Sequence, residues 1–262
     1  RELRRKMYMA FPTVCMHDNE ENNIEICRNI VNLRTEIVQL LGYDTFADYV
    51  LGESMASAVE NVYALFDQLI KAYKPTALRE TEEIKEMARR MEGEDFCMEP
   101  WDMSFYAHKL QMERYNIDSE VVRPYFKLDN VINGVFSLAT TLYGITFKEN
   151  KEIPVYHPDV KAYEVYDENG AYLAILYADF YPRKGKHSGA WMTEYKSQCI
   201  KRNGENVRPH VSLVTNFTKP TAEKPALLSL GEVETFLHEF GHTLHGIFSN
   251  THYACLSGTS VY

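Results

Sequence analysis

Residues 229–248, SLGEVETFLHEFGHTLHGIF, decide how the rest of this sequence is interpreted. Ser229 and Glu232 have the S-x-x-E spacing of a capping box, which is typical of a helix N-terminus. Apolar residues then recur every three or four positions, as expected for one buried helix face: Val233, Phe236, Leu237, Phe240 and Leu244. The stretch therefore predicts one amphipathic helix.

A second stripe of the same predicted helix carries His238 and His242, which lie four residues apart. Their imidazoles would sit one helical turn apart, so both can reach a single ion. With Glu239 they form H-E-x-x-H, in which two histidines hold zinc and the glutamate takes a proton from water. Gly241 leaves room beside the ion for a backbone or a substrate. The alternative is a structural helix with histidines on its polar side.

Composition limits the possible partners. Acidic residues outnumber basic ones by 37 to 28, which gives a net charge of −9 and disfavours nucleic acid or an anionic membrane. No apolar run approaches the roughly 18 residues of a membrane span. With 45% hydrophobic residues, the chain can bury a substantial core in one large domain or two lobes.

The five cysteines are widely spaced and never form C-x-x-C: Cys15, Cys27, Cys97, Cys199 and Cys255. This pattern indicates buried or idle thiols of a reducing compartment, so we expect a cytoplasmic location. The sequence begins at Arg1 and stops at Tyr262 in mid-pattern. We therefore expect a part of a longer protein, truncated at both ends, in which a targeting signal would not be visible.

Helical periodicity dominates residues 1–150. Gly42 and Gly144 are expected C-caps, Asp44 an expected N-cap, and Pro75 an expected stop signal. The charge-dense segment 76–91 indicates a solvated helix face rather than a binding surface. The predicted helices span residues 24–41, 44–50, 59–70, 100–115 and 128–142.

From about Tyr156 the pattern changes to that of strands. Residues 161–166 and 171–178 predict a hairpin around Glu168-Asn169-Gly170, and residues 208–217 predict a third strand. The fold class is mostly α, with a small β-sheet next to the active-site helix: an α+β arrangement like that of zincin peptidases. There an edge strand beside the metal pairs with the substrate backbone. We predict a helical part over 1–150 and the sheet with the zinc helix over 151–262.

Several longer stretches carry a family resemblance. They are residues 227–248 followed by LSGTSV (256–261), WDMSFYAHKL (101–110), RPYFKLDNVINGVFSLATTLYGITF (123–147) and GAWM (189–192). Together they closely resemble the thimet-oligopeptidase-like family of zinc metallopeptidases (M3) over essentially the whole chain. Within it, the forms of LSGT and GAWM and the opening MYMAFPTVCMHDNEENN are most similar to bacterial peptidyl-dipeptidases (dipeptidyl carboxypeptidases). Oligopeptidase A-like endopeptidases are the alternative.

The resemblance implies a largely helical, two-lobed protein around a deep channel that admits only short unfolded peptides. It implies one Zn²⁺ per site, short peptides as substrates and a monomer, with no nucleic acid or membrane as partner. Glu239 would be the catalytic base that moves the proton of the attacking water to the leaving amine. The strand around Gly189, Ala190 and Trp191 would bind the peptide backbone.

The third metal ligand is the open point. A catalytic zinc site uses three protein ligands and keeps one open position. No Asp or Glu follows Glu239, so only His245, His252 and Cys255 could complete the site within the chain. His245 is followed by G-I-F-S and lacks the metzincin continuation, so we expect it to orient or pack rather than to ligate.

The family resemblance implies a glutamate ligand about 25 residues past His242, just beyond Tyr262. Residues 1–262 alone are therefore expected to be inactive. A substrate's C-terminal carboxylate could bind Arg183, Lys184 or Lys186, although we expect these residues to form a solvated basic loop.

Two other classes of protein are alternatives to a metallopeptidase. A serine hydrolase would need G-x-S-x-G, and in GKHSG (185–189) the serine stands in the wrong place. A non-catalytic helical scaffold is the non-enzyme alternative, and it would retain no stoichiometric zinc. Residues 216–218 fit a glycosylation sequon within a predicted strand, which we interpret as accidental.

Overall fold

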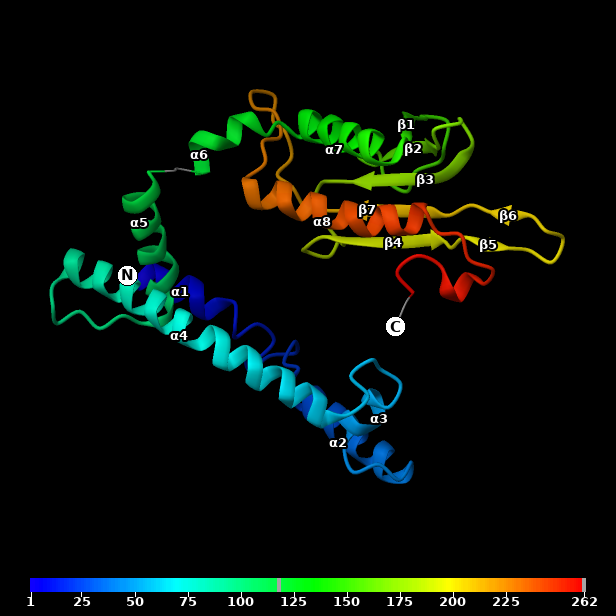
Figure 1. The fold of residues 1–262 in the computed structure, drawn as a ribbon. Helices are drawn as coiled ribbons and strands as arrows, with labels where there is room; N and C mark the ends of the chain where they lie inside the picture. Colours follow the sequence, from blue (N-terminus) through cyan, green and yellow to red (C-terminus); the bar gives the residue numbers. More distant parts are fainter. Residues whose placement is uncertain (117–118, 261–262) are drawn as a thin grey trace. The chain divides into compact units, whose positions relative to one another are not determined.

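A computed structural model describes residues 1–116 and 119–260 of the chain, which fall into two compact units (Figure 1). The first unit covers residues 1–116, and the second contains residues 119–260. The sequence pattern predicted a boundary at residue 150. In the structure, the helix and strand before that position lie in the second unit, because they pack with the sheet there.

The first unit consists of helices. Two of them match the expected spans closely: the helix that ends before Gly42, and the helix that Pro100-Trp101-Asp102 opens. The short third helix begins after Thr45 rather than Asp44, because Thr45 and Asp48 form the capping box. The elements are α1 (Glu2–Ala10), α2 (Ile24–Leu40), α3 (Phe46–Leu51), α4 (Val59–Glu92), η1 (Pro100–Asp102) and α5 (Met103–Tyr115).

Helix α4 overturns one expectation, since it does not stop before Pro75. It runs for 34 residues with Pro75 inside it. A proline in a helix interior costs about 3 kcal/mol. That cost is offset by the turns on both sides of Pro75 and by packing of α4 on α5, where Glu83 pairs with Arg114 at 2.7 Å.

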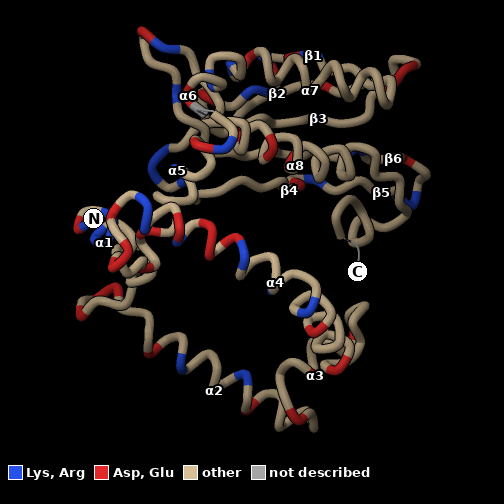
Figure 2. The backbone as a smooth tube through the Cα atoms, turned by 60° about the vertical axis from the view of Figure 1, so that its left-hand side comes forward, with Lys and Arg blue, Asp and Glu red and all other residues tan. Residues whose placement is uncertain are grey.

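Charged residues of both signs are interspersed along the chain (Figure 2). On α4, Glu82 binds Lys85 at 3.3 Å and Arg89 at 2.9 Å, and all three side chains are partly exposed. This agrees with the expected solvated face of segment 76–91. Exposed pairs of this kind contribute little to stability.

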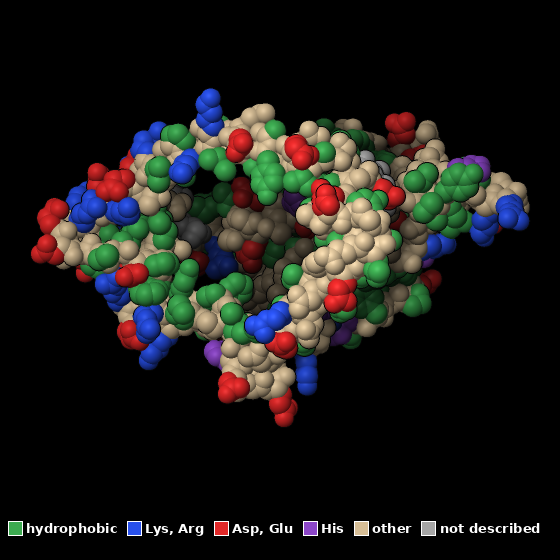
Figure 3. Space-filling view, turned by 90° about the horizontal axis from the view of Figure 1, so that it is seen from below, with side chains coloured by type: hydrophobic (Ala, Val, Ile, Leu, Met, Phe, Trp, Pro, Cys, Tyr) green, Lys and Arg blue, Asp and Glu red, His purple; other side chains and the backbone are tan. Residues whose placement is uncertain are grey.

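The substantial core that the composition predicted belongs to the second unit. Among the described residues of the first unit, the buried apolar side chains are Val38, Met87, Ala88 and Tyr106. Many large apolar side chains of α1, α2 and α4 are exposed instead. Figure 3 shows hydrophobic side chains among charged ones on one face of the molecule.

The second unit is built on a five-stranded mixed sheet in the order β1-β2-β3-β7-β4. The predicted hairpin is confirmed as β2 and β3, and the third predicted strand is confirmed as the shorter β7. β3 and β7 are parallel, and the other neighbours are antiparallel. The strands are β1 (Thr146–Glu149), β2 (Lys161–Tyr166), β3 (Tyr172–Asp179), β4 (Trp191–Lys196) and β7 (His210–Val214), with a separate pair β5 (Cys199–Ile200) and β6 (Asn206–Val207).

Two long helices share one hydrophobic cluster with the sheet (Figure 1). Helix α7 (Leu128–Tyr143) ends at Gly144, whose φ of 71° is the left-handed C-cap expected from the sequence. Helix α8 (Leu230–Ile247) packs on β7 and β4. The remaining elements are α6 (Ser119–Val122), η2 (Arg123–Tyr125) and η3 (Ala254–Leu256).

Within the described residues, no helix combines the length and apolar content needed to cross a bilayer. All five cysteines are free, and none is fully buried.

Helix α8 approaches the sheet closely at Gly246, which gives a test of the packing. A Cβ there would lie 2.7 Å from Val211 Cγ1 and 3.0 Å from Glu194 Oε1. We expect Gly246→Ala to lower the free energy of unfolding by about 1–3 kcal/mol through overpacking. Thermal unfolding of the complete protein measures this.

Gly231→Ala in the first turn of α8 is the matched control, because nothing lies within 4 Å of its added Cβ. Its helix propensity should leave the melting temperature equal or higher. Equal melting temperatures for the two variants would contradict the close approach of α8 to β7.

Candidate active site

The helix that carries the histidines begins as the sequence predicted. The backbone N–H of Ser229 donates to Glu232 Oε2 at 2.7 Å, and the Glu232 N–H donates to Ser229 Oγ at 3.2 Å. This reciprocal capping box fixes the first turn of α8. Contacts between neighbouring residues therefore set where the helix begins, independently of its packing on the sheet.

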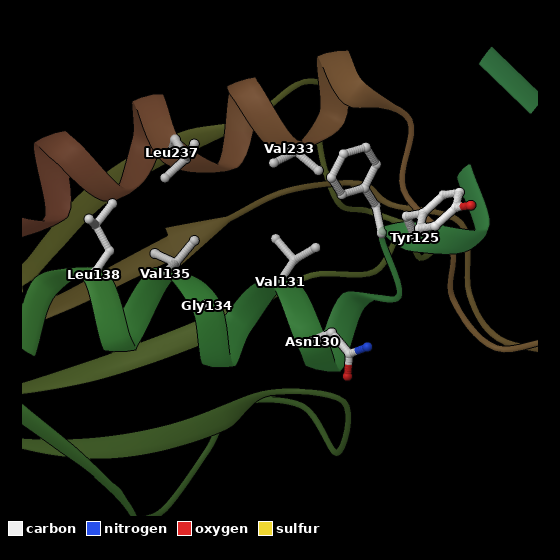
Figure 4. A pocket seen from close by; sticks show the side chains of 9 residues that line it. Tyr125, Asn130, Val131, Gly134, Val135, Leu138, Val233 and Leu237 are labelled. Atoms are coloured by element: carbon white, nitrogen blue, oxygen red, sulfur yellow. The ribbon is translucent and has the colours of Figure 1, made fainter. Parts of the chain in front are cut away.

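One predicted residue of the buried face of α8, Leu237, is not buried. Phe236 and Phe240 are buried, and Val233 and Leu244 pack against the same core, as expected. Leu237 is 40% exposed, because it points toward α7 at the rim of a surface groove rather than toward the sheet (Figure 4). Thr243, Gly246 and Ile247 complete the buried face.

His238 and His242 both lie on the exposed side of α8. Their Nε2 atoms are 3.2 Å apart. Two nitrogens bound to zinc at 2.0–2.1 Å and at a tetrahedral angle would be about 3.3–3.4 Å apart. The two side chains therefore fit a shared zinc ion in the rotamers that the structure shows.

Glu239 lies between the histidines in sequence and is half-buried. Its main-chain carbonyl accepts a hydrogen bond from Thr243 Oγ1 at 2.9 Å, which links it to the buried side of the helix. At Gly241, an added Cβ would meet no atom of the described residues within 4 Å. A residue or substrate can therefore approach α8 at Gly241, as the glycine at this position predicted.

The described residues supply only two metal ligands at this place. No group of three His, Cys, Asp or Glu side chains that could hold a metal is formed among residues 1–116 and 119–260. His245 is exposed one turn further along α8, and neither His252 nor Cys255 joins the pair. The chemistry of the donors fits zinc, but the count is one short of a catalytic site.

Strand β4 lies at the edge of the sheet, and α8 packs over it. On its helix-facing side, Glu194 lies against Gly246 and Gly258. Gly258 has φ 59°, and a side chain there would overlap Glu194 Oε1, so glycine is required. That buried oxygen has no hydrogen-bond partner among the described residues. Sequence reasoning missed this packing, since no local pattern signals it.

The basic loop before β4 is not solvated in the way that the sequence suggested. Lys186 is only 3% exposed and binds Asp179 at 2.9 Å, while Arg183 forms a two-pronged pair with the same carboxylate at 2.8 Å. Of the three candidate carboxylate anchors, only Lys184 is fully on the surface. Arg183 and Lys186 hold the loop instead, because Asp179 already occupies them.

Asp179 is itself 2% exposed. Burial raises the pKa of its carboxyl, but hydrogen bonds from Arg183 and Lys186 outweigh that effect and hold the pKa below its ordinary value. The carboxylate therefore stays charged inside the unit at neutral pH. A sequence offers no signal for this cluster, because its members look like ordinary loop charges.

The predicted substrate-binding residues lie where that loop enters the edge strand. Gly189 is exposed with φ 94°, Ala190 is half-buried, and Trp191 begins β4. Asn216, the first residue of the sequon, uses its side-chain amide to hold the loop backbone, which supports the interpretation of the sequon as accidental. Ser188, the serine of GKHSG (185–189), lies on the exposed part of the same loop.

A pocket of about 330 Å³ lies between α7 and α8 (Figure 4). Val131, Val135 and Leu138 line it from α7, and Val233 and Leu237 line it from α8. Tyr125 is the one titratable side chain among its lining residues. The pocket therefore lacks the groups for hydrolysis, and His238, Glu239 and His242 are not part of it.

Comparison with known proteins gives consistent results. The model of "Peptidase family M3" matches residues 1–262. The chain is 37% identical over 261 residues to dipeptidyl carboxypeptidase of Escherichia coli (strain K12), and 36% identical over 262 residues to oligopeptidase A of the same organism. These matches cover 99% and 98% of this chain and 38% of each relative.

A plant relative is also similar. Organellar oligopeptidase A of Arabidopsis thaliana is 35% identical over 264 residues, which cover 98% of this chain and 33% of that protein. The chain therefore spans well under half the length of these relatives.

The geometry predicts which histidines bind metal. In the complete protein, His242→Ala should abolish stoichiometric zinc, because one of the two adjacent imidazoles is lost. His245→Ala is the matched control one turn away and should retain zinc. Elemental analysis after dialysis measures both, and loss of zinc in the His245 variant would make that residue a ligand.

Proposed function

This chain belongs to peptidase family M3, and we propose that it forms part of a zinc-dependent peptidase that hydrolyses short unfolded peptides. The observation that carries the proposal is the 3.2 Å separation of the His238 and His242 Nε2 atoms on the exposed side of α8. Glu239 on the same helix supplies a carboxylate, and the neighbouring β4 supplies a free sheet edge.

His238 and His242 would hold the ion, with a third ligand from outside residues 1–262. The family resemblance suggests a glutamate for that ligand, and the longer relatives are consistent with it. When bound, zinc would lower the pKa of water to about 7 and polarise the scissile carbonyl.

Glu239 would act as the general base and then as the general acid. Its carboxylate accepts a proton from the attacking water as the new C–O bond forms. The same carboxyl then delivers that proton to the nitrogen of the leaving amine as the C–N bond breaks. Attachment to a rigid, capped helix keeps the carboxylate in place through both transfers.

The edge of β4 would bind the peptide as an added strand. Among the described residues, β7 pairs with one side of β4 and no strand pairs with the other. Main-chain hydrogen bonds along such an edge give affinity without strong side-chain selection. Gly189, Ala190 and Trp191 stand at the start of that edge.

We propose release of C-terminal dipeptides as the mode of cleavage. The close similarity to dipeptidyl carboxypeptidase supports this mode, and the nearly equal similarity to oligopeptidase A makes endopeptidase cleavage the second candidate. Arg183 and Lys186 are bound to Asp179, so the substrate's carboxylate would need an anchor elsewhere. Free thiols suit a cytoplasmic location. The net charge of −9 disfavours nucleic acid or an anionic membrane as partner, and we propose a monomer that acts on short peptides.

The role of Glu239 can be tested by Glu239→Gln in the complete protein. We expect zinc to remain and kcat to fall by a factor on the order of 10³ or more, because the amide cannot accept the proton. Glu223→Gln on an exposed loop is the matched control and should keep full activity. Near-normal turnover in the Glu239 variant would remove this residue from the role.

The mode of cleavage can be tested with one peptide in two forms. The free acid should lose successive dipeptides from its C-terminus, and the C-terminal amide should be cut much more slowly, because the carboxylate is the anchor. Mass spectrometry of timed digests measures both. Equal rates, or cuts mainly in the interior, would favour the endopeptidase.

A further inference from the structure

The β3–β4 loop, residues 180–190, leads directly into the free edge strand of the candidate site. It is glycine-bearing and largely exposed, so its sequence suggests a mobile connection. In the structure it is held at two points by side chains whose polar atoms bind main-chain oxygens.

The first point of attachment is Lys186. Its buried Nζ donates to Asp179 Oδ1 at 2.9 Å, and to the carbonyls of Tyr181 at 2.8 Å and Thr215 at 2.6 Å. With Arg183 on the same carboxylate, this cluster fixes the first half of the loop. It is a stability element, because removal of Asp179 would leave the buried Lys186 ammonium without a counter-charge.

The second point of attachment is Asn216, two residues past β7. Its Nδ2 donates to the carbonyl of His187 at 2.9 Å and to the carbonyl of Gly189 at 2.7 Å. A side-chain amide has two N–H groups, and both are used on the loop. Asn216 therefore fixes the chain immediately before Ala190 and β4.

We infer that Asn216 is a positioning residue for peptide binding, a role that rests on the function proposed above. By holding the carbonyls of His187 and Gly189, it sets the direction in which the edge strand starts. Since the Gly189 carbonyl is already bound to Asn216, the groups that pair with a substrate begin at Ala190. A loop ordered in advance spares the entropy that binding would otherwise cost.

In the described part of the chain, the Asn216 amide donates to the carbonyls of His187 and Gly189 and not to His238, Glu239 or His242, so its proposed role concerns binding rather than chemistry. Loss of its amide should disorder the entry to β4 and leave the proposed metal ligands and base untouched. We therefore expect loss of the amide to raise KM and to leave kcat and zinc content unchanged.

The test uses Asn216→Ala and the isosteric Asn216→Asp, which removes both donors, in the complete zinc-loaded protein. We expect KM for an unblocked peptide to rise about tenfold in both variants, with kcat and zinc content within about twofold of the parent. Asn169→Ala, at an exposed asparagine in the β2–β3 turn, is the matched control and should leave KM unchanged.

Limited trypsin digestion gives a readout that does not depend on activity. Cleavage after Arg183 and Lys184 should become faster in both Asn216 variants, because the second attachment of the loop is lost. An unchanged KM in an active Asn216→Ala protein would overturn the inference, as would a fall in kcat at constant KM. A parent protein without peptidase activity, or an active Glu239→Gln variant, would instead overturn the proposed function on which the inference rests.

Discussion

The candidate site depends on the way in which α8 is pressed onto the sheet. Phe236, Phe240 and Ile247 are almost completely buried in the core that α7, α8 and the sheet share, so the helix cannot rotate about its axis. With 3.6 residues per turn, that fixed face leaves His238 and His242 together on the outside. Burial of the apolar stripe of α8 thus determines the direction of the stripe that carries the histidines. On that stripe the Nε2 atoms of the two imidazoles are 3.2 Å apart.

Polar contacts complete this arrangement at the far end of the helix. Arg208 donates to the carbonyls of Ile247 at 2.8 Å and Ser249 at 3.0 Å, and to that of Leu173 on β3 at 2.7 Å. It thereby satisfies helix-terminal carbonyls and ties them to the sheet. The fully buried Gln198 then holds the backbone of Thr251 at 2.7 Å. The segment after α8 is therefore directed by buried hydrogen bonds rather than left free.

How much of this could be predicted depends on whether the signal is local. The capping box at Ser229, the period of α8, the hairpin at Gly170 and the C-cap at Gly144 all involve residues close in sequence, and these predictions are confirmed. Pro75 was misinterpreted as a stop signal, because packing of α4 on α5 overrides local preference. Leu237 was placed in the core because helical period alone cannot tell a groove from a buried face.

The remaining features required contacts between distant residues. Asp179 with Lys186, Asn216 with the carbonyl of His187, and Glu194 with Gly258 are joined only by the fold. In sequence they look like ordinary charged or polar positions. The position of the boundary between the two units was also hidden, since the apolar pattern of residues 128–142 shows a helix but not which partner it packs on.

X-ray absorption at the zinc edge of the complete protein tests the central claim most directly. The account predicts a first shell of two imidazole nitrogens and additional oxygen at about 2.0–2.2 Å, with outer-shell scattering from both rings. Substitution of either His238 or His242 should remove one ring from that pattern. A shell with a single imidazole in the unaltered protein would contradict a site built on these two histidines, and a thiolate at about 2.3 Å would contradict an oxygen third ligand.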